Sequence, residues 1–166
     1  MRLRTRRSLV AVDPTARGIA FAFFSRGELL DWGHRRCGRD ERAVIAFVEE
    51  LVTSHDVRIL LLEDVASDRS RRRPRIGRLL RKLAIKVRAM RVSVLEIPRE
   101  DVRIRWAAKG LTTKEAVAAA IARELPELQP FVPPPRKTWM CESPAVNVFD
   151  AVSLVFHRFG AADPVR

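Results

Sequence analysis

The chain of 166 residues has no tyrosine and only 7% aromatic residues, so a stacking surface for single-stranded nucleic acid is weakly supported. Its two cysteines, Cys37 and Cys141, are too few for a disulfide framework and favour a reducing compartment, which predicts a cytoplasmic location. No apolar run reaches the length of a membrane span, so no membrane association is expected. The basic N-terminus precedes an apolar segment, as in a signal peptide, but Asp13 interrupts that segment and no small-residue cleavage site follows it.

Acidic residues are scarce compared with basic ones. Lys and Arg number 32 against 20 Asp and Glu, which gives a formal net charge of +12. An excess of this size favours a polyanionic partner, most often nucleic acid, and the arginine side chain suits two-point contacts with phosphate. The alternative is a solvated basic surface in an arginine-rich composition.

Hydrophobic residues make up 47% of the chain, which is enough for a packed core, and the length suits a single domain over residues 1–166. Apolar periodicity and turn residues predict strands at 8–13, 17–27, 28–38, 56–65 and 91–98 and helices at 39–55, 76–90, 111–128 and 147–157. The first three strands follow one another closely, as in an antiparallel meander, and the later strands alternate with helices. The predicted fold class is therefore α/β, with a mixed five-stranded sheet (order β-β-β-α-β-α-β-α-α) flanked by helices.

Carboxylates stand at the ends of two predicted strands. Asp13 ends the first strand, and Glu63 ends a near-continuous apolar run that is expected at the centre of the sheet. Taken singly, a carboxylate at the end of a strand is most often a turn former or helix cap. Asp150 in the final apolar helix would be a third acid near that edge, and three converging carboxylates repel one another unless a cation lies between them. Divalent hard cations accept such oxygen ligands, so the set predicts a metal site.

Several segments, taken in order, resemble the RNase H-like superfamily, and most closely its RuvC-type Holliday-junction resolvase branch. LVAVDPTARGIAFAFF resembles that family's first hairpin, and LLLEDV resembles the strand that carries its catalytic Glu. IPREDVRIRWAAKGLTTKEAVAAAIARELPEL resembles the segment in which a Gly and a Lys precede an amphipathic helix, and NVFDAVSLVFH resembles the final helix. The resemblance spans most of the chain and implies an RNase H-like fold and a metal-dependent nuclease.

The residues that match the family's catalytic metal ligands are Asp13, Glu63 and Asp150. The resemblance implies that they hold Mg²⁺, with Mn²⁺ as a substitute. Asn147 stands where the final helix usually has its first Asp, and it keeps an oxygen that can bind metal. His157, two turns after Asp150, is suited to proton transfer, with a structural role at the helix end as the alternative. Glu142, just before the helix, would supply a further acid if its loop folds back.

Basic side chains follow the strand that ends at Glu63 and flank the start of the helix at 111–128. The candidates for contact with a nucleic-acid backbone are Arg71, Arg72, Arg73, Arg75, Arg78, Lys82, Lys109 and Lys114. Contacts of this kind raise affinity in a salt-dependent way and carry little sequence information.

The first functional hypothesis is a metal-dependent endonuclease that cuts branched DNA such as a Holliday junction, in which bound Mg²⁺ activates water. A resolvase cuts two symmetric strands, which implies a homodimer. We expect the interface on the helix at 76–90, whose apolar stripe consists of Ile76, Leu79, Leu80, Leu83 and Val87. The alternatives are a non-catalytic nucleic-acid-binding module on the same fold and an RNase H-like nuclease that acts on RNA or an RNA–DNA hybrid.

Overall fold

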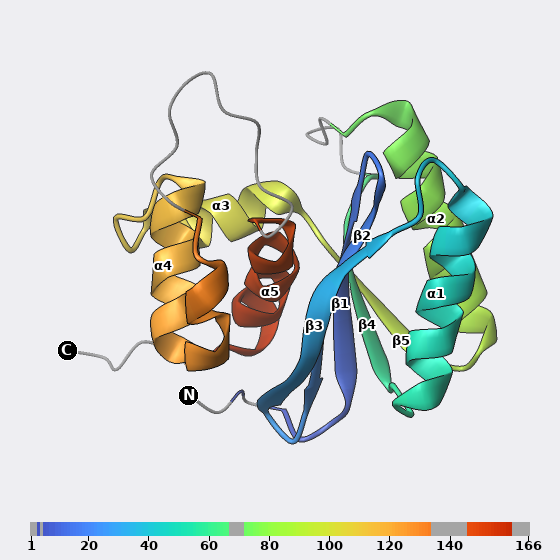
Figure 1. The fold of residues 1–166 in the computed structure, drawn as a ribbon, viewed down its shortest axis with the longest axis horizontal. Helices are drawn as coiled ribbons and strands as arrows, with labels where there is room; N and C mark the ends of the chain where they lie inside the picture. The colour runs from blue at the N-terminus through green and yellow to red at the C-terminus, as the bar shows by residue number, and fades with distance from the viewer. Residues whose placement is uncertain (1–2, 4, 67–71, 134–145, 161–166) are drawn as a thin grey trace.

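The computed structural model describes residue 3 and residues 5–66, 72–133 and 146–160. At its centre lies a five-stranded sheet in the order β3-β2-β1-β4-β5 (Figure 1). The strands are β1 (Leu9–Thr15), β2 (Gly18–Ser25), β3 (Glu28–Arg36), β4 (Ile59–Glu63) and β5 (Ser93–Ile97). The first three form an antiparallel meander, whereas β4 lies parallel to both β1 and β5. The predicted mixed five-stranded sheet is therefore confirmed.

Helices cover both faces of this sheet (Figure 1). On one face lie α1 (Glu41–Ser54) and α2 (Pro74–Ala89), and on the other lie α3 (Arg99–Ala107), α4 (Lys114–Glu124) and α5 (Val146–Phe159). Of the last three, α5 packs directly on the sheet and contacts β1 to β4, while α4 packs against α5 and a short 3₁₀ helix, η1 (Pro126–Phe131). The final helix thus meets the strands that carry Asp13 and Glu63.

The pleat of the strands divides their side chains between two apolar clusters. Along β1, Val10 belongs to the cluster beneath α1 and α2, whereas Ala11 belongs to the cluster beneath α5, which also contains Leu61 of β4. Successive side chains on a strand point to opposite faces, so a residue two positions on lies on the same face. Asp13 and Glu63 therefore project from the face that α5 covers.

The apolar stripe of α2 belongs to the core of one chain and does not form a dimer interface. Its five side chains are at most 5% exposed, and they pack in the cluster shared with α1 and the sheet; they are Ile76, Leu79, Leu80, Leu83 and Val87. Our prediction that this stripe joins two chains is wrong, because the burial it needs is already supplied by α1 and the sheet. The remaining surface of α2 is basic, since the helix contains arginines and lysines but no acidic residue.

The structure also contains a helix that the sequence pattern does not predict. α3 follows directly on β5 and Pro98, and it buries only Val102 and Trp106, so its sequence shows only weak apolar periodicity among charged residues.

The first strand is longer than predicted. Asp13 was expected to end it, but β1 continues two residues past Asp13, where its pairing with β4 has already ended. Within the described residues, no helix has the length and apolar character needed to cross a membrane.

Candidate active site

Asp13 and Glu63 reach the same end of the sheet because of strand register. Ala11 pairs with Leu61, so the two carboxylates lie two residues further along two parallel neighbouring strands. Both residues are deeply buried, with exposed fractions of 4% for Asp13 and 5% for Glu63. Carboxylates at this depth are tolerated when they are paired with a cation or with hydrogen-bond donors.

The third predicted acid, Asp150, reaches these two from α5. Its side chain is 20% exposed, so it lies closer to the surface than Asp13 and Glu63. The three carboxylates line a cavity of about 320 Å³ whose remaining walls come largely from α3, α4 and α5, including Trp106 and Phe149. Apolar walls strengthen electrostatic interactions at the charged end of such a cavity.

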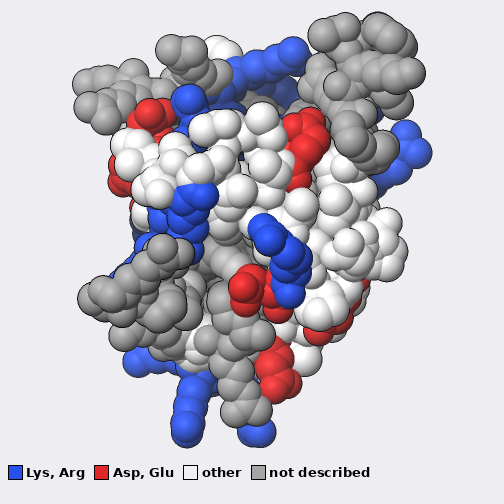
Figure 2. Space-filling model, turned by 90° about the vertical axis from the view of Figure 1, so that its left-hand side faces the viewer, with Lys and Arg blue, Asp and Glu red and all other residues white. Residues whose placement is uncertain are grey.

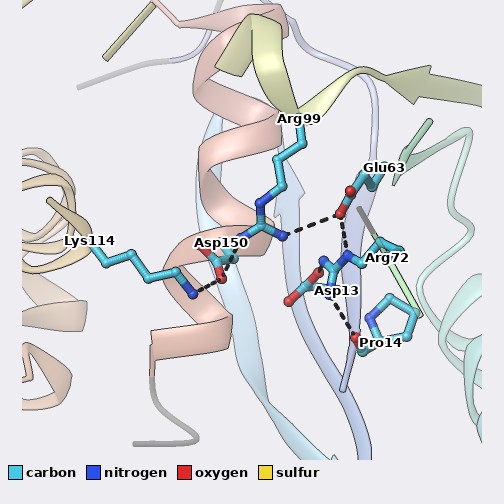
Figure 3. Close-up of polar contacts among 7 residues, drawn as sticks. All are labelled: Asp13, Pro14, Glu63, Arg72, Arg99, Lys114 and Asp150. Atoms are coloured by element: carbon cyan, nitrogen blue, oxygen red, sulfur yellow. Dashed lines mark hydrogen bonds and ion pairs between the residues drawn. The ribbon is translucent and has the colours of Figure 1, made fainter. Parts of the chain in front are cut away.

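Two arginines bridge the carboxylates in pairs (Figure 3). Arg72 donates from Nε to Glu63 Oε2 at 2.6 Å and from Nη2 to Asp13 Oδ1. Arg99 donates from Nη1 to the same oxygen of Glu63 and from Nη2 to Asp150 Oδ2, both at 3.3 Å. Glu63 therefore occupies the centre of a chain of ion pairs that runs from β1 to α5.

Lys114 completes this network at its α5 end. It is the first residue of α4, and its Nζ lies 3.1 Å from Asp150 Oδ2 (Figure 3). Among the described residues, three carboxylates and three cationic groups meet here, and these six groups carry no net charge when all are ionised.

Burial governs the ionisation of Asp13. It raises the pKa of Asp13 from 3.8 to about 6; attraction to Arg72 and Arg99 opposes this rise, and repulsion from Asp150 and Glu63 adds to it. Burial also disfavours the charged form of Arg72, yet the carboxylates of Asp13 and Glu63 outweigh it and raise the pKa of Arg72. The arginines therefore stay positively charged, whereas burial makes the ionised form of Asp13 unfavourable.

The donor set fits a hard divalent cation, because carboxylate oxygens are the ligands that Mg²⁺ and Mn²⁺ prefer. In the part of the chain that the structure describes, no group of three acidic, His or Cys side chains is arranged closely enough to hold an ion. At the centre of the network, the Arg72 guanidinium lies between Asp13 and Glu63 (Figure 3). These two carboxylates therefore already have a cationic partner within the protein.

The two other predicted residues of α5 lie apart from this network. Neither Asn147 nor His157 is among the residues that line the cavity. Burial and Arg105 lower the pKa of His157 while Asp101 raises it, and its Nδ1 is buried without a partner among the described residues. The electrostatic surroundings of His157 thus include α3. Metal binding by Asn147 and proton transfer by His157 stay predictions.

Two residues predicted to contact phosphate, Arg72 and Lys114, contact carboxylates in this structure. Lys109 is exposed just beyond the end of α3. Arg71 and Glu142 fall outside the described residues, so the structure says nothing of their predicted roles.

The other basic candidates lie at the N-terminal half of α2, on the opposite side of the sheet from α5. Arg73 and Arg78 are exposed, whereas Arg75 and Lys82 approach Glu41 of α1 at 3.8 Å and 2.7 Å. On the face seen from the α4 side, the Lys and Arg side chains that the structure describes are scattered among uncharged and acidic residues (Figure 2). Arg73 and Arg78 are therefore exposed candidates for contact with a polyanion on the α2 side of the sheet.

Sequence reasoning missed Arg99, although a signal for it exists. Glu63 pairs with Ile97 across the parallel β4–β5 ladder, so residues just after Ile97 lie at the same sheet edge as Glu63. Pro98 ends the strand and Arg99 begins α3. Arg99 lies two residues beyond Ile97, on the strand next to the one that carries Glu63. It was therefore a candidate for an ion pair with that buried carboxylate.

No family model and no curated relative matches this sequence. Solved structures do match its fold. RuvC from Thermus thermophilus has a TM-score of 0.61 and 16% identity, covering 90% of this chain and 92% of that one. T. thermophilus RuvC in complex with Holliday junction substrate has a TM-score of 0.61, 14% identity and 91% coverage of both chains. The yeast mitochondrial Holliday junction resolvase Ydc2 has a TM-score of 0.60 and 10% identity, covering 92% of this chain and 77% of that one. The chain therefore has the RNase H-like fold seen in RuvC-type resolvases.

Proposed function

We propose that this chain is a metal-dependent endonuclease that cuts branched DNA, in the manner of a Holliday-junction resolvase. The observation that carries the proposal is the meeting of Asp13, Glu63 and Asp150 at one end of a RuvC-type sheet. A structural neighbour in complex with a Holliday junction supports branched DNA as the substrate.

In this proposal the three carboxylates hold Mg²⁺, with Mn²⁺ as a substitute. The chemistry that such ions supply is activation of a water molecule and stabilisation of the leaving oxygen. The chain contributes ligands on two rigid strands and a helix, which fixes their positions before substrate arrives. Lys114, whose side chain is 42% exposed and 3.1 Å from Asp150, would hold a backbone phosphate beside the ligands.

Resolution of a four-way junction requires cuts in two symmetric strands, so we expect two copies of the chain to act together as a homodimer. Their interface would use a surface other than the buried stripe of α2. The cytoplasmic location and the single-domain organisation remain sequence-based predictions.

A substrate panel tests the proposed function. The protein would be incubated with a labelled four-way junction, a linear duplex, an RNA–DNA hybrid and a single strand, each with Mg²⁺ and with EDTA. We expect paired symmetric nicks in the junction that require Mg²⁺ or Mn²⁺. Cleavage of only the hybrid or RNA would reject the DNA resolvase and support a nuclease that acts on RNA or an RNA–DNA hybrid.

A second candidate is a non-catalytic module that binds structured nucleic acid. The balanced network favours it, because Arg72, Arg99 and Lys114 already neutralise the carboxylates that a metal would need. Junction binding without any cleavage in Mg²⁺ or Mn²⁺ would establish this reading and reject the nuclease.

Binding to the junction should depend on salt through the exposed arginines of the α2 side, Arg73 and Arg78. Each phosphate contact contributes about 0.9 to the slope of log affinity against log salt, so neutralising Arg73 and Arg78 together should lower the slope by about 2. Fluorescence anisotropy at several salt concentrations measures the affinity for the junction and thus this slope. The control neutralises Arg58 and Arg123, which lie at the start of β4 and near the end of α4; an equal loss of slope there would mean that binding is spread over the whole surface.

A further inference from the structure

We infer that Arg72 is a displaceable counter-ion of the carboxylate site, which occupies the metal position in the metal-free protein and leaves it when a divalent cation binds. This inference rests on the proposed metal-dependent function. It assigns to Arg72 a role that differs from a permanent structural ion pair and from a simple phosphate contact.

Geometry singles out Arg72 among the cations of the site. Its guanidinium contacts Asp13 and Glu63 at once, and these are the two ligands that strand register sets side by side. A metal held by Asp13 and Glu63 would compete with the Arg72 guanidinium for the same two carboxylates. Arg99 also reaches Glu63 Oε2, at 3.3 Å, but its second contact is with Asp150 rather than Asp13. Lys114 contacts Asp150, the most exposed of the three acids.

Charge disfavours the presence of both occupants at once. The three carboxylates and three cations of the network cancel, so a divalent ion added with Arg72 in place would leave a surplus of two positive charges in a poorly solvated cavity. If Arg72 leaves, the ion and the remaining Arg99 and Lys114 face three negative charges, and the surplus falls to one. Carboxylate oxygens are the ligands that such a cation prefers, which favours the exchange at sufficient metal concentration.

The backbone of Arg72 permits this movement. Arg72 belongs to neither a helix nor a strand, because β4 ends at Glu63 and α2 begins at Pro74. Its side chain is 20% exposed, so part of it already meets solvent. Release would also break the contact from its Nη1 to the backbone oxygen of Pro14, at 3.5 Å. Once released it would lie beside the occupied site as a free bidentate phosphate donor. Metal binding would in this way convert an internal ion pair into a substrate contact.

Metal affinity tests the inference without relying on cleavage. Mn²⁺ would be titrated calorimetrically into EDTA-treated, dialysed full-length protein and into its Arg72→Gln and Arg72→Lys variants. We expect Arg72→Gln to bind Mn²⁺ at least ten-fold more tightly than wild type, with Arg72→Lys in between. Arg81→Gln removes the same charge from an exposed position on α2 and should stay within two-fold of wild type.

The outcomes separate this inference from the proposed function. If wild type binds Mn²⁺, Asp13→Asn does not, and Arg72→Gln binds no more tightly than wild type, Arg72 does not compete with metal and the nuclease proposal stands. If neither wild type nor Arg72→Gln binds Mn²⁺, the metal-dependent function fails, and the inference with it. An equal gain in Mn²⁺ affinity in Arg81→Gln would show that the effect comes from the overall charge of the protein, and it would overturn the specific role of Arg72.

Wild-type protein provides a second test that does not depend on the folding of a variant. In a ¹H–¹⁵N spectrum, the Nε–H of Arg72 bound to Glu63 should give a resolved signal, assigned by its loss in Arg72→Lys. Saturating Mg²⁺ should move this signal to the position of solvent-exposed arginines. A signal that stays unchanged at saturation would show that Arg72 remains between the carboxylates and would overturn the inference.

Discussion

Replacing Asp13 by Asn should lower the rate of junction cleavage by about 10³-fold or more while leaving junction binding intact or stronger, since losing even one group that stabilises a transition state electrostatically commonly costs 10²–10³ in rate. The substitution keeps the size of the side chain and one oxygen but removes the charge that holds the metal. Binding should persist because phosphate contacts come from arginines and lysines outside the ligand set. Cleavage and binding would be measured on the same four-way junction at saturating Mg²⁺.

Glu63→Gln should behave in the same way, and Asp64→Asn provides the matched control. Asp64 is the next acid in the chain, but its Oδ1 accepts a hydrogen bond from the backbone of Ala66 at the turn after β4. Cleavage by Asp64→Asn should stay within a few-fold of wild type. If Asp13→Asn cuts the junction at the wild-type rate, the carboxylates identified here do not form the catalytic centre.

The fold was predictable because its strands carry strong local signals. Three short apolar segments separated by turn residues specified the meander, and the continuous run Leu60–Leu62 specified a strand buried on both faces. Asp40 was predicted to cap the helix after it, and its side chain accepts from the amides of Arg42 and Ala43. α3 escaped prediction because two buried residues in nine leave too little periodicity to distinguish a helix from a charged loop.

The acidic half of the site was predictable and the basic half was not. Asp13 and Glu63 occur at fixed positions in parallel strands, so register alone brings them together. Arg72 and Arg99 come from segments outside the regular pairing of the sheet, and their long side chains reach the carboxylates only through the tertiary fold. A basic run such as that around Arg72 is equally compatible with solvent, phosphate or a buried acid, and composition cannot choose among them.

The same ambiguity explains the error over α2. An amphipathic stripe shows that a helix buries one face, but it does not show whether the covering surface is the same chain or a second copy. Here Val44 and Val48 of α1, together with the sheet, cover the stripe. The order of elements already required a helix on this face of the sheet, which was the better reason to assign the stripe to the core.

In EDTA, Asp13→Asn should stabilise the protein above pH 6, by between about 1 and 3 kcal/mol. The pKa of Asp13 is about 6 in the folded protein against 3.8 for the ordinary side chain. The folded state therefore holds this proton more tightly than the unfolded chain does, so the free energy of unfolding falls as pH rises from about 4 to about 6 and stays low above that range. A shift of about two pKa units corresponds to about 3 kcal/mol at most. Asparagine cannot ionise, so it avoids this loss, and the difference should vanish below pH 4.

Urea denaturation at pH 4, 6 and 8 measures this effect, with Glu50→Gln as a control that neutralises an exposed carboxylate and should change stability by less than about 0.5 kcal/mol. Saturating Mg²⁺ should reverse the order at pH 8, because an ion that binds only the folded wild type stabilises it by mass action while Asp13→Asn gains little. A variant that is no more stable than wild type in EDTA would mean that Arg72 and Arg99 fully offset the burial of Asp13. Stabilisation in EDTA together with loss of cleavage would show that Asp13 lowers the stability of the metal-free protein at a position that activity requires.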